Sequence, residues 1–198
     1  MLVCIVFHSG YGHTRRVAES VRAGVARVPD THVELIPVDA LPADSPRWTE
    51  LDAADAIIFG APTYMGSVSS DMKRFMEATS SRWMKLAWAD KIAAGFTNSG
   101  SQEGDKHNTL VSFATLSAQH GMVWINLNVP PGNNNSRGSV EDLNRLGASL
   151  GLMTQSNIDQ GPDVVPPPSD LRTAEVFGER VARCTHRWLI GRAPSSPS

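Results

Sequence analysis

Several features that mark other protein classes are scarce or missing in this sequence. Its 198 residues include only two cysteines, Cys4 and Cys184, which stand far apart and form no CxxC pair. This content predicts a reducing, cytoplasmic location. No apolar run approaches the ~20 residues that a membrane-spanning helix needs. The apolar start, MLVCIVFH, lacks the basic flank of a signal peptide, so we expect a cytoplasmic protein without a membrane span.

An excess of charge of one sign is missing as well. Lys and Arg together number 18 and Asp and Glu 20, for a formal net charge of −2. Such a balance provides no extended field to attract nucleic acid or an acidic membrane, so we expect neither as a partner. We also expect no metal, because HExxH does not occur and no metal-ligand spacing joins the histidines His8, His32, His107 and His186.

Familiar phosphate-binding and nucleophile motifs are either absent from the sequence or stand outside the structural context that they need. The Walker A string GxxxxGK[ST] does not occur, and Gly10-x-Gly12 is followed three places later by Arg15 where GxGxxG needs glycine. Neither cysteine is followed, after five residues, by the arginine of a phosphatase loop. The string GxSxG occurs once, at Gly147–Gly151, but it does not directly follow a predicted strand, as a nucleophile elbow must. A nucleotide triphosphatase, a dinucleotide-binding Rossmann domain, a cysteine phosphatase and a serine hydrolase are therefore not indicated.

What the sequence does contain is a regular alternation of strand-like and helix-like segments. Apolar or alternating runs predict strands over Leu2–Phe7, His32–Val38, Ala54–Phe59, Lys91–Thr97 and Met122–Leu127. Apolar residues at helical spacing predict helices over 14–28, 68–76 and 110–116, and a last helix from about Ser169 through Trp188. This alternation indicates an α/β protein with a doubly wound, five-stranded parallel sheet in the order 2-1-3-4-5.

The chain shows no internal repeat and no domain boundary. We expect one domain over residues 1–190 and a disordered Pro/Ser-rich tail over 191–198. About forty residues, Asn128–Pro168, separate the last strand from the last helix, and connections of that length are usually functional or disordered. Within them, Val140–Leu152 has a helical pattern, which predicts order.

The turn after the first strand is built for an oxyanion. Ser9–Thr14 joins that strand to the first helix, so its backbone N–H groups are the free donors of a helix N-terminus. Two glycines allow the backbone to wrap tightly, and two hydroxyls add donors. The candidate phosphate-binding residues are Ser9, Gly10, Tyr11, Gly12, His13 and Thr14.

Two further turns lie at the carboxyl ends of strands, where this topology places its ligand. The second turn has a rigid proline and the ring of Tyr64, which can stack on a flat ligand; the third is rich in N–H groups and hydroxyls, which suit the polar edge of a heterocycle. The candidate residues are Pro62, Thr63, Tyr64, Met65 and Gly66 in the second turn, and Asn98, Ser99, Gly100, Ser101 and Gly104 in the third. A phosphate together with a planar heteroaromatic ring describes a mononucleotide, and flavin mononucleotide (FMN) fits best.

These segments also resemble a known family. Ser9-x-Tyr11-Gly12-x-Thr14 resembles the phosphate loop of flavodoxin-like proteins, and the segments 57–77 and 113–124 are similar to those of the flavodoxin-like NAD(P)H:quinone oxidoreductases, the group of the tryptophan repressor-binding protein. The resemblance implies a flavodoxin-like fold with FMN bound by the three turns. It also implies that His120 lies at the flavin, that Tyr11 and Trp83 line the nicotinamide and quinone site, and that the protein is a homodimer or homotetramer.

The function that follows is two-electron reduction of quinones by NAD(P)H, in ping-pong fashion, on bound FMN. Two alternatives stay open. One is a one-electron carrier of the flavodoxin type that docks on redox partner proteins, although such carriers are typically more acidic than this chain. The other is an FMN-binding regulatory module.

Overall fold

The computed structural model describes residues 1–191 of the chain. The tail that the sequence predicts to be disordered falls mostly outside this range, since residues 192–198 are not described. Its first residue, Gly191, is instead the last residue of the final helix. No helix in the described part is long and apolar enough to cross a membrane.

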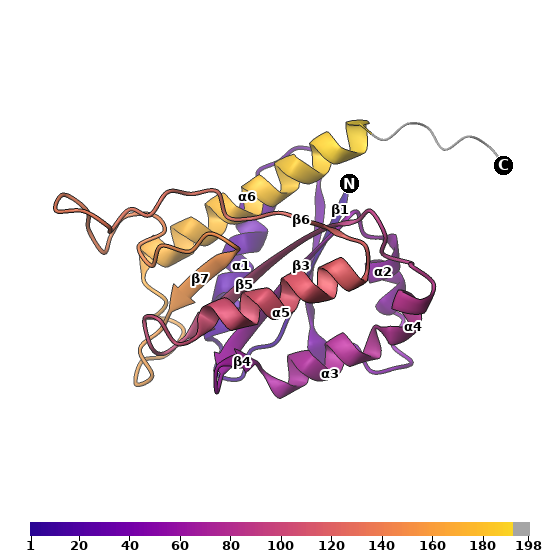
Figure 1. Cartoon of the computed structure of the whole chain (residues 1–198), viewed down its shortest axis with the longest axis horizontal. Coiled ribbons are helices and arrows are strands. Elements are labelled where there is room, and N and C mark those ends of the chain that lie inside the picture. Colours follow the sequence, from indigo (N-terminus) through magenta and orange to yellow (C-terminus); the bar gives the residue numbers. More distant parts are fainter. Residues whose placement is uncertain (192–198) are drawn as a thin grey trace.

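A parallel sheet forms the centre of the structure (Figure 1). Its main path runs in the order β2-β1-β3-β5-β6, which confirms the predicted order of five strands and the α/β class. The strands on this path are β1 (Leu2–Phe7), β2 (His32–Pro37), β3 (Ala56–Tyr64), β5 (Ile92–Ser99) and β6 (Val123–Trp124). All four neighbouring pairs on the path are parallel, so the strand ends that carry the candidate turns share one edge.

The last sheet position differs from the prediction. Of the expected strand Met122–Leu127, only the two residues of β6 pair with β5, next to Ile92 and Ala93. The other half of β5, from Phe96 to Ser99, pairs instead with β7 (Leu152–Gln155), which was not predicted. The long connection thus contributes a strand beside the carboxyl end of β5, because β6 leaves that stretch of β5 uncovered.

Helices cover both faces of the sheet (Figure 1). The α-helices are α1 (His13–Val25), α2 (Trp48–Ala53), α3 (Ser70–Ala78), α4 (Ser80–Met84), α5 (Lys106–Gln119) and α6 (Pro168–Gly191), and a short 3-10 turn, η1, spans Val38–Ala40. The short strand β4 (Ser67–Val68) pairs antiparallel with the end of β3, so Val68, predicted as helical, is in a hairpin.

Two apolar layers follow from the alternation of side chains along the buried strands. On one face, α1 and α6 bury valines such as Val17 and Val181 against Ile5 and Ile58. On the other face, α2, α3 and α5 pack Trp48, Phe75, Phe113 and other side chains against Ile57 and Phe59. The layers hold the sheet rigid, and the loops at its carboxyl edge are positioned by it.

Val140–Leu152, whose helical pattern predicts order, does not form a helix: residues 140–146 form turns and a bend, and Leu152 begins β7. Side-chain bonds keep this segment ordered. The Asn144 amide donates to the carbonyls of Val129 and Ala148 and accepts from the Ala148 N–H. Arg145 pairs with Asp170 of α6, its Nε 2.7 Å from Oδ1. Since an asparagine and an arginine satisfy the backbone here, helical hydrogen bonds are not needed.

Candidate functional site

The three candidate turns meet around one cavity at the carboxyl edge of the sheet. Its volume is about 690 Å³, within the usual range for small-molecule and cofactor sites. Nine of the predicted residues line it: Tyr11, His13, Thr14, Pro62, Thr63, Tyr64, Asn98, Ser99 and Gly100. The other seven predicted turn residues belong to the same turns but do not line the cavity: Ser9, Gly10, Gly12, Met65, Gly66, Ser101 and Gly104. The three predicted turns therefore supply part of the cavity walls, and the assignment of each residue to a ligand stays a prediction.

The first turn presents free donors. Gly12 caps α1 in the left-handed region, with φ 89°, which only glycine adopts without strain. Among the described residues, the backbone N–H groups from Gly10 to Thr14 find no acceptor, whereas the Arg15 N–H is held by Ser9 Oγ at 3.1 Å. Thr14 is buried, and its hydroxyl has no hydrogen-bond partner within residues 1–191. Such a set of donors at a helix N-terminus fits a phosphate.

Two tyrosine rings stand over this turn. The rings of Tyr11 and Tyr64 meet edge to face, with centroids 6.3 Å apart. A Cβ at Gly10 would lie 2.6 Å from the Tyr64 hydroxyl, so the absence of a side chain at Gly10 allows Tyr64 to reach across from the second turn. Partial burial raises the pKa of Tyr64. Tyr11 is 76% exposed, and it leaves an aromatic surface at the mouth of the cavity.

Asn98, at the end of β5, has a fixed amide orientation. Its Oδ1 accepts hydrogen bonds from Thr154 Oγ1 at 2.8 Å and from Ser156 Oγ at 3.0 Å. Both donors come from β7 and the residue after it. With the oxygen occupied, the Nδ2 group is left facing the cavity that Asn98 lines. The side chain is only 5% exposed, so this donor is preorganised for an acceptor on a ligand.

A fourth segment, which the sequence did not identify, completes the cavity. It follows β7 and contributes Ser156, Ile158, Asp159, Gln160 and Gly161 to the lining. The segment is tied to the first turn by a hydrogen bond between His13 Nε2 and the Gln160 carbonyl, at 2.8 Å, and by Pro162, which lies over Gly12. The one signal for it in the sequence was the unusual length of the connection between the last strand and the last helix.

The third turn is held from behind. Lys106, the first residue of α5, donates to Ser99 Oγ and to the carbonyls of Ser101 and Gln102, at 2.7 to 2.8 Å. Gln155 of β7 donates to the Gly100 carbonyl at 2.9 Å. These bonds occupy the carbonyls of the turn on its buried side, so the turn keeps one conformation.

Two predicted residues lie elsewhere. His120 ends α5 at the opposite edge of the sheet from the cavity, roughly 20 Å along the helix from Lys106. It is buried against Trp88 and bonded through Nε2 to Thr79 Oγ1 at 2.9 Å, and its Nδ1 has no partner in the part of the chain that the structure describes. Burial lowers its pKa. Trp83 of α4 lines a small hollow with His120. Within one chain, neither residue lines the cavity, and the placing of His120 at a flavin and of Trp83 at the nicotinamide and quinone site stays a prediction.

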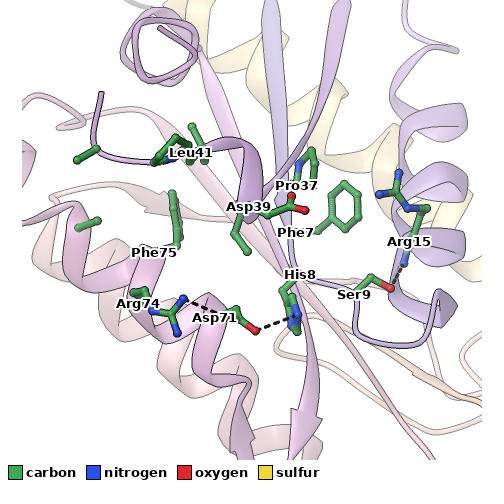
Figure 2. A pocket seen from close by; sticks show the side chains of 14 residues that line it. Phe7, His8, Ser9, Arg15, Pro37, Asp39, Leu41, Asp71, Arg74 and Phe75 are labelled. Carbon is green, nitrogen blue, oxygen red and sulfur yellow. Dashed lines mark hydrogen bonds and ion pairs between the residues drawn. The ribbon is translucent and has the colours of Figure 1, made fainter. Parts of the chain in front are cut away.

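A second cavity, of about 560 Å³, lies on the other side of the first turn, at the ends of β1 and β2 (Figure 2). Its polar side chains are largely paired with one another. His8 Nδ1 is 2.7 Å from Ser69 Oγ and its Nε2 is 3.3 Å from Asp71, which also binds Arg74 at 3.2 Å. The guanidinium of Arg15 lies over the Phe7 ring (Figure 2). With these groups engaged, the cavity offers fewer free donors than the first one, although it shares Ser9 with the phosphate turn.

FMN fits the first cavity on the observations above. Unpaired N–H groups and the Thr14 hydroxyl would hold the phosphate, and Asn98 and the third turn would bind the polar edge of the ring. FMN, when bound, supplies two-electron hydride chemistry, while the protein supplies position and electrostatics. In the described residues, no cluster of His, Cys, Asp or Glu could hold a metal ion.

The sequence matches the NADPH-dependent FMN reductase family over residues 10–131. A protein of Pseudomonas aeruginosa named Flavodoxin FldP is 42% identical over 182 residues, which cover 90% of this chain and 94% of that protein. An NAD(P)H dehydrogenase (quinone) of Geotalea daltonii is 30% identical over 97% of this chain and 100% of its own length.

Solved structures agree on the fold. The crystal structure of a flavodoxin, a WrbA-like protein from Agrobacterium tumefaciens, superposes with a TM-score of 0.71 at 37% identity, over 94% of this chain and 98% of that one. An archaeal flavodoxin gives a TM-score of 0.64 at 19% identity, over 94% of this chain and 99% of that one. The second likeness supports the flavodoxin-like fold alone.

Proposed function

The chain belongs to the flavodoxin-like NAD(P)H:quinone oxidoreductase family, with FMN as its cofactor, and we propose that it reduces quinones with NAD(P)H. It is an FMN-dependent oxidoreductase. We propose that NAD(P)H is the electron donor, that a quinone is the acceptor, and that the two react in ping-pong order. A cytoplasmic location stays a prediction from the cysteine content.

The observation that carries the proposal is the shape of the cavity at the carboxyl edge. Its inner end has the free donors of the first turn, and its rim has two largely exposed side chains, Tyr11 and Ile158. An aromatic and an aliphatic side chain at the rim suit a second flat ligand stacked on the flavin. One open face can accommodate the donor or the acceptor but not both, so each must leave before the other enters.

The chain's own residues then have distinct tasks. The donors of the first turn and Thr14 hold the phosphate. Asn98 and the N–H groups of the third turn face the polar edge of the ring, where preorganised donors stabilise negative charge gained on reduction. Tyr11 borders the open side and offers its ring to the flat ligand that stacks there. None of these tasks requires a side chain to act as a general acid or base.

Steady-state kinetics test the proposal. With FMN bound, the rate of NADH or NADPH oxidation is measured while the concentrations of nicotinamide and a benzoquinone are varied together. We expect parallel lines in double-reciprocal plots. Tyr11→Ala should change the turnover and leave the affinity for FMN nearly unchanged, because backbone groups next to the ring hold the phosphate. Intersecting lines, or no dependence on benzoquinone, would contradict the proposal.

A second candidate function is electron transfer to partner proteins, as in flavodoxins. It is favoured by the 42% identity to the protein named Flavodoxin FldP. The near balance of charges on this chain is unlike the strongly acidic surface that a steered carrier typically uses. A carrier would react slowly with free NADH or NADPH and rapidly with a reductase protein, which separates the two functions in one experiment.

We also propose that the protein forms a homodimer or homotetramer. Trp83, Met84 and Leu86 form an exposed apolar group around α4, of the kind that subunit contacts cover. If Trp83 and His120 serve a flavin, they reach that of a second copy, because their hollow lies at the opposite edge of the sheet from their own chain's cavity.

A further inference from the structure

A lysine is completely buried behind the third turn. Lys106 has 0% exposure, and its three N–H groups donate to one hydroxyl and two carbonyl oxygens. All three acceptors are neutral, and no carboxylate lies within ion-pair distance of its nitrogen in the described residues. A buried ammonium without a counter-ion is costly, so its presence calls for an explanation beyond holding a turn.

The charges around Lys106 leave its own charge unbalanced. Among the carboxylates, Asp170 of α6 has the largest electrostatic effect on Lys106, but it forms a buried ion pair with Arg145. Glu103, in the third turn, is exposed to water and therefore screened. Burial lowers the pKa of Lys106 to about 8, so the side chain is mostly protonated near neutral pH. The buried group behind the turn thus carries a net positive charge.

This charge lies one residue layer from the cavity. Ser99, which accepts a hydrogen bond from Lys106 at 2.8 Å, lines the cavity itself. FMN that takes up two electrons and one proton gains one negative charge. A positive charge that faces the site through a low-dielectric wall stabilises the reduced form more than the oxidised form.

We propose that Lys106 is a positioning residue whose positive charge raises the reduction potential of FMN in this protein. The inference rests on FMN binding in the cavity, and not on which donor or acceptor reacts there. The alternative is a purely structural role, in which the three hydrogen bonds shape the third turn and the charge has no effect on the flavin. The two roles differ in the affinity ratio between reduced and oxidised FMN.

The test compares Lys106→Met and Lys106→Gln with the wild-type protein. Dissociation constants are measured for oxidised FMN and for FMN reduced by dithionite, and the two-electron midpoint potential is measured against redox dyes. We expect both variants to weaken reduced FMN roughly tenfold more than oxidised FMN, which lowers the potential by about 30 mV. Arg22→Met, which removes an exposed positive charge on α1, should leave the potential unchanged.

An equal loss of affinity for both forms, with an unchanged potential, would overturn the proposal and leave the structural role. Recovery of the wild-type potential by glutamine, which keeps an N–H donor without charge, would do the same. If neither variant folds, the wild-type protein provides the test, because Lys106 loses its charge between pH 7 and pH 9. Reduced FMN should lose affinity relative to oxidised FMN over this range. A constant ratio of the two dissociation constants would refute the role of the charge. None of these measurements involves a nicotinamide or a quinone. The role of Lys106 can therefore be refuted while the proposed function holds, and the proposed function can be refuted while the role of Lys106 holds.

Discussion

Replacing Asn98 by aspartate tests how the cavity binds the polar edge of its ligand. The substitution keeps the size of the side chain and the oxygen that accepts from Thr154 and Ser156. It replaces the Nδ2 donor with a second, negatively charged oxygen. Because the two oxygens of a carboxylate are equivalent, an oxygen replaces the Nδ2 donor whichever way the side chain turns.

The expected loss follows from that exchange. A buried acceptor on the ligand would lose its donor, which costs about 1–3 kcal/mol, and the dissociation constant for FMN would rise roughly 5- to 150-fold. The added negative charge should weaken reduced FMN more than oxidised FMN, because the reduced form is itself anionic.

Titration of the flavin-free protein with FMN, followed by quenching of flavin fluorescence, measures the effect. Asn135→Asp makes the same change of charge at an exposed position in the long connection and should bind FMN like the wild-type protein. Thermal unfolding without FMN shows whether Asn98→Asp still folds. A well-folded Asn98→Asp protein with wild-type affinity for both forms of FMN would refute the orientation assigned to the amide.

Four further predictions address other parts of the structure. Thr14→Ala should weaken FMN by about 1.5–3 kcal/mol, as expected for a hydrogen bond to a charged group, and leave riboflavin affinity unchanged; an equal loss for both ligands in titrations would contradict a phosphate at this turn. Gly12→Ala should lower the free energy of unfolding by about 1–2 kcal/mol in urea, because φ is 89° there and the new Cβ would meet Pro162 at 2.9 Å; unchanged stability would contradict this. The pKa of Lys106 is about 8 in the folded chain and 10.5 ordinarily, so between these pH values the folded chain binds fewer protons than the unfolded chain. The free energy of unfolding should therefore rise with pH across that window, by at most about 3 kcal/mol relative to Lys106→Met. Urea unfolding at pH 7.5 and at pH 10 checks the sign. Sedimentation at micromolar concentration should show a dimer or tetramer, and Trp83→Glu should shift it towards the monomer; a monomeric wild-type protein would contradict the proposed assembly.

The order of the sheet could be predicted because each element on the main path carries its own local signal. The continuous apolar run from Leu2 to Phe7 is typical of a strand buried on both faces, and the valine spacing from Val17 to Val25 marks the helix that covers it. Gly10 and Gly12 identify the first turn. The ends of β3 and β5 then fall at the same edge by topology alone, which brings together nine of the predicted residues.

The segment after β7 could not be predicted because its structure depends on distant partners. Leu152–Gln155 becomes a strand because β6 leaves the carboxyl half of β5 open, and nothing local in those four residues distinguishes a strand from a loop. Val140–Leu152 has a helical pattern, yet the bonds of Asn144 and Arg145 to other elements impose turns. His120 lies far from the cavity of its own chain because α5 spans the sheet from Lys106, at the carboxyl edge, to its C-terminal end at the opposite edge. The role of His120 at a flavin stays a prediction.

Anaerobic rapid mixing of the FMN-loaded protein with NADH, and separately with NADPH, tests the central claim most directly. The flavin absorbance near its visible maximum is followed, and a benzoquinone is then added. The account predicts that at least one nicotinamide bleaches the flavin directly and completely, without a partner protein, and that the quinone restores the oxidised spectrum. Flavin that stays oxidised with an excess of both nicotinamides would contradict the proposed function and favour an electron carrier.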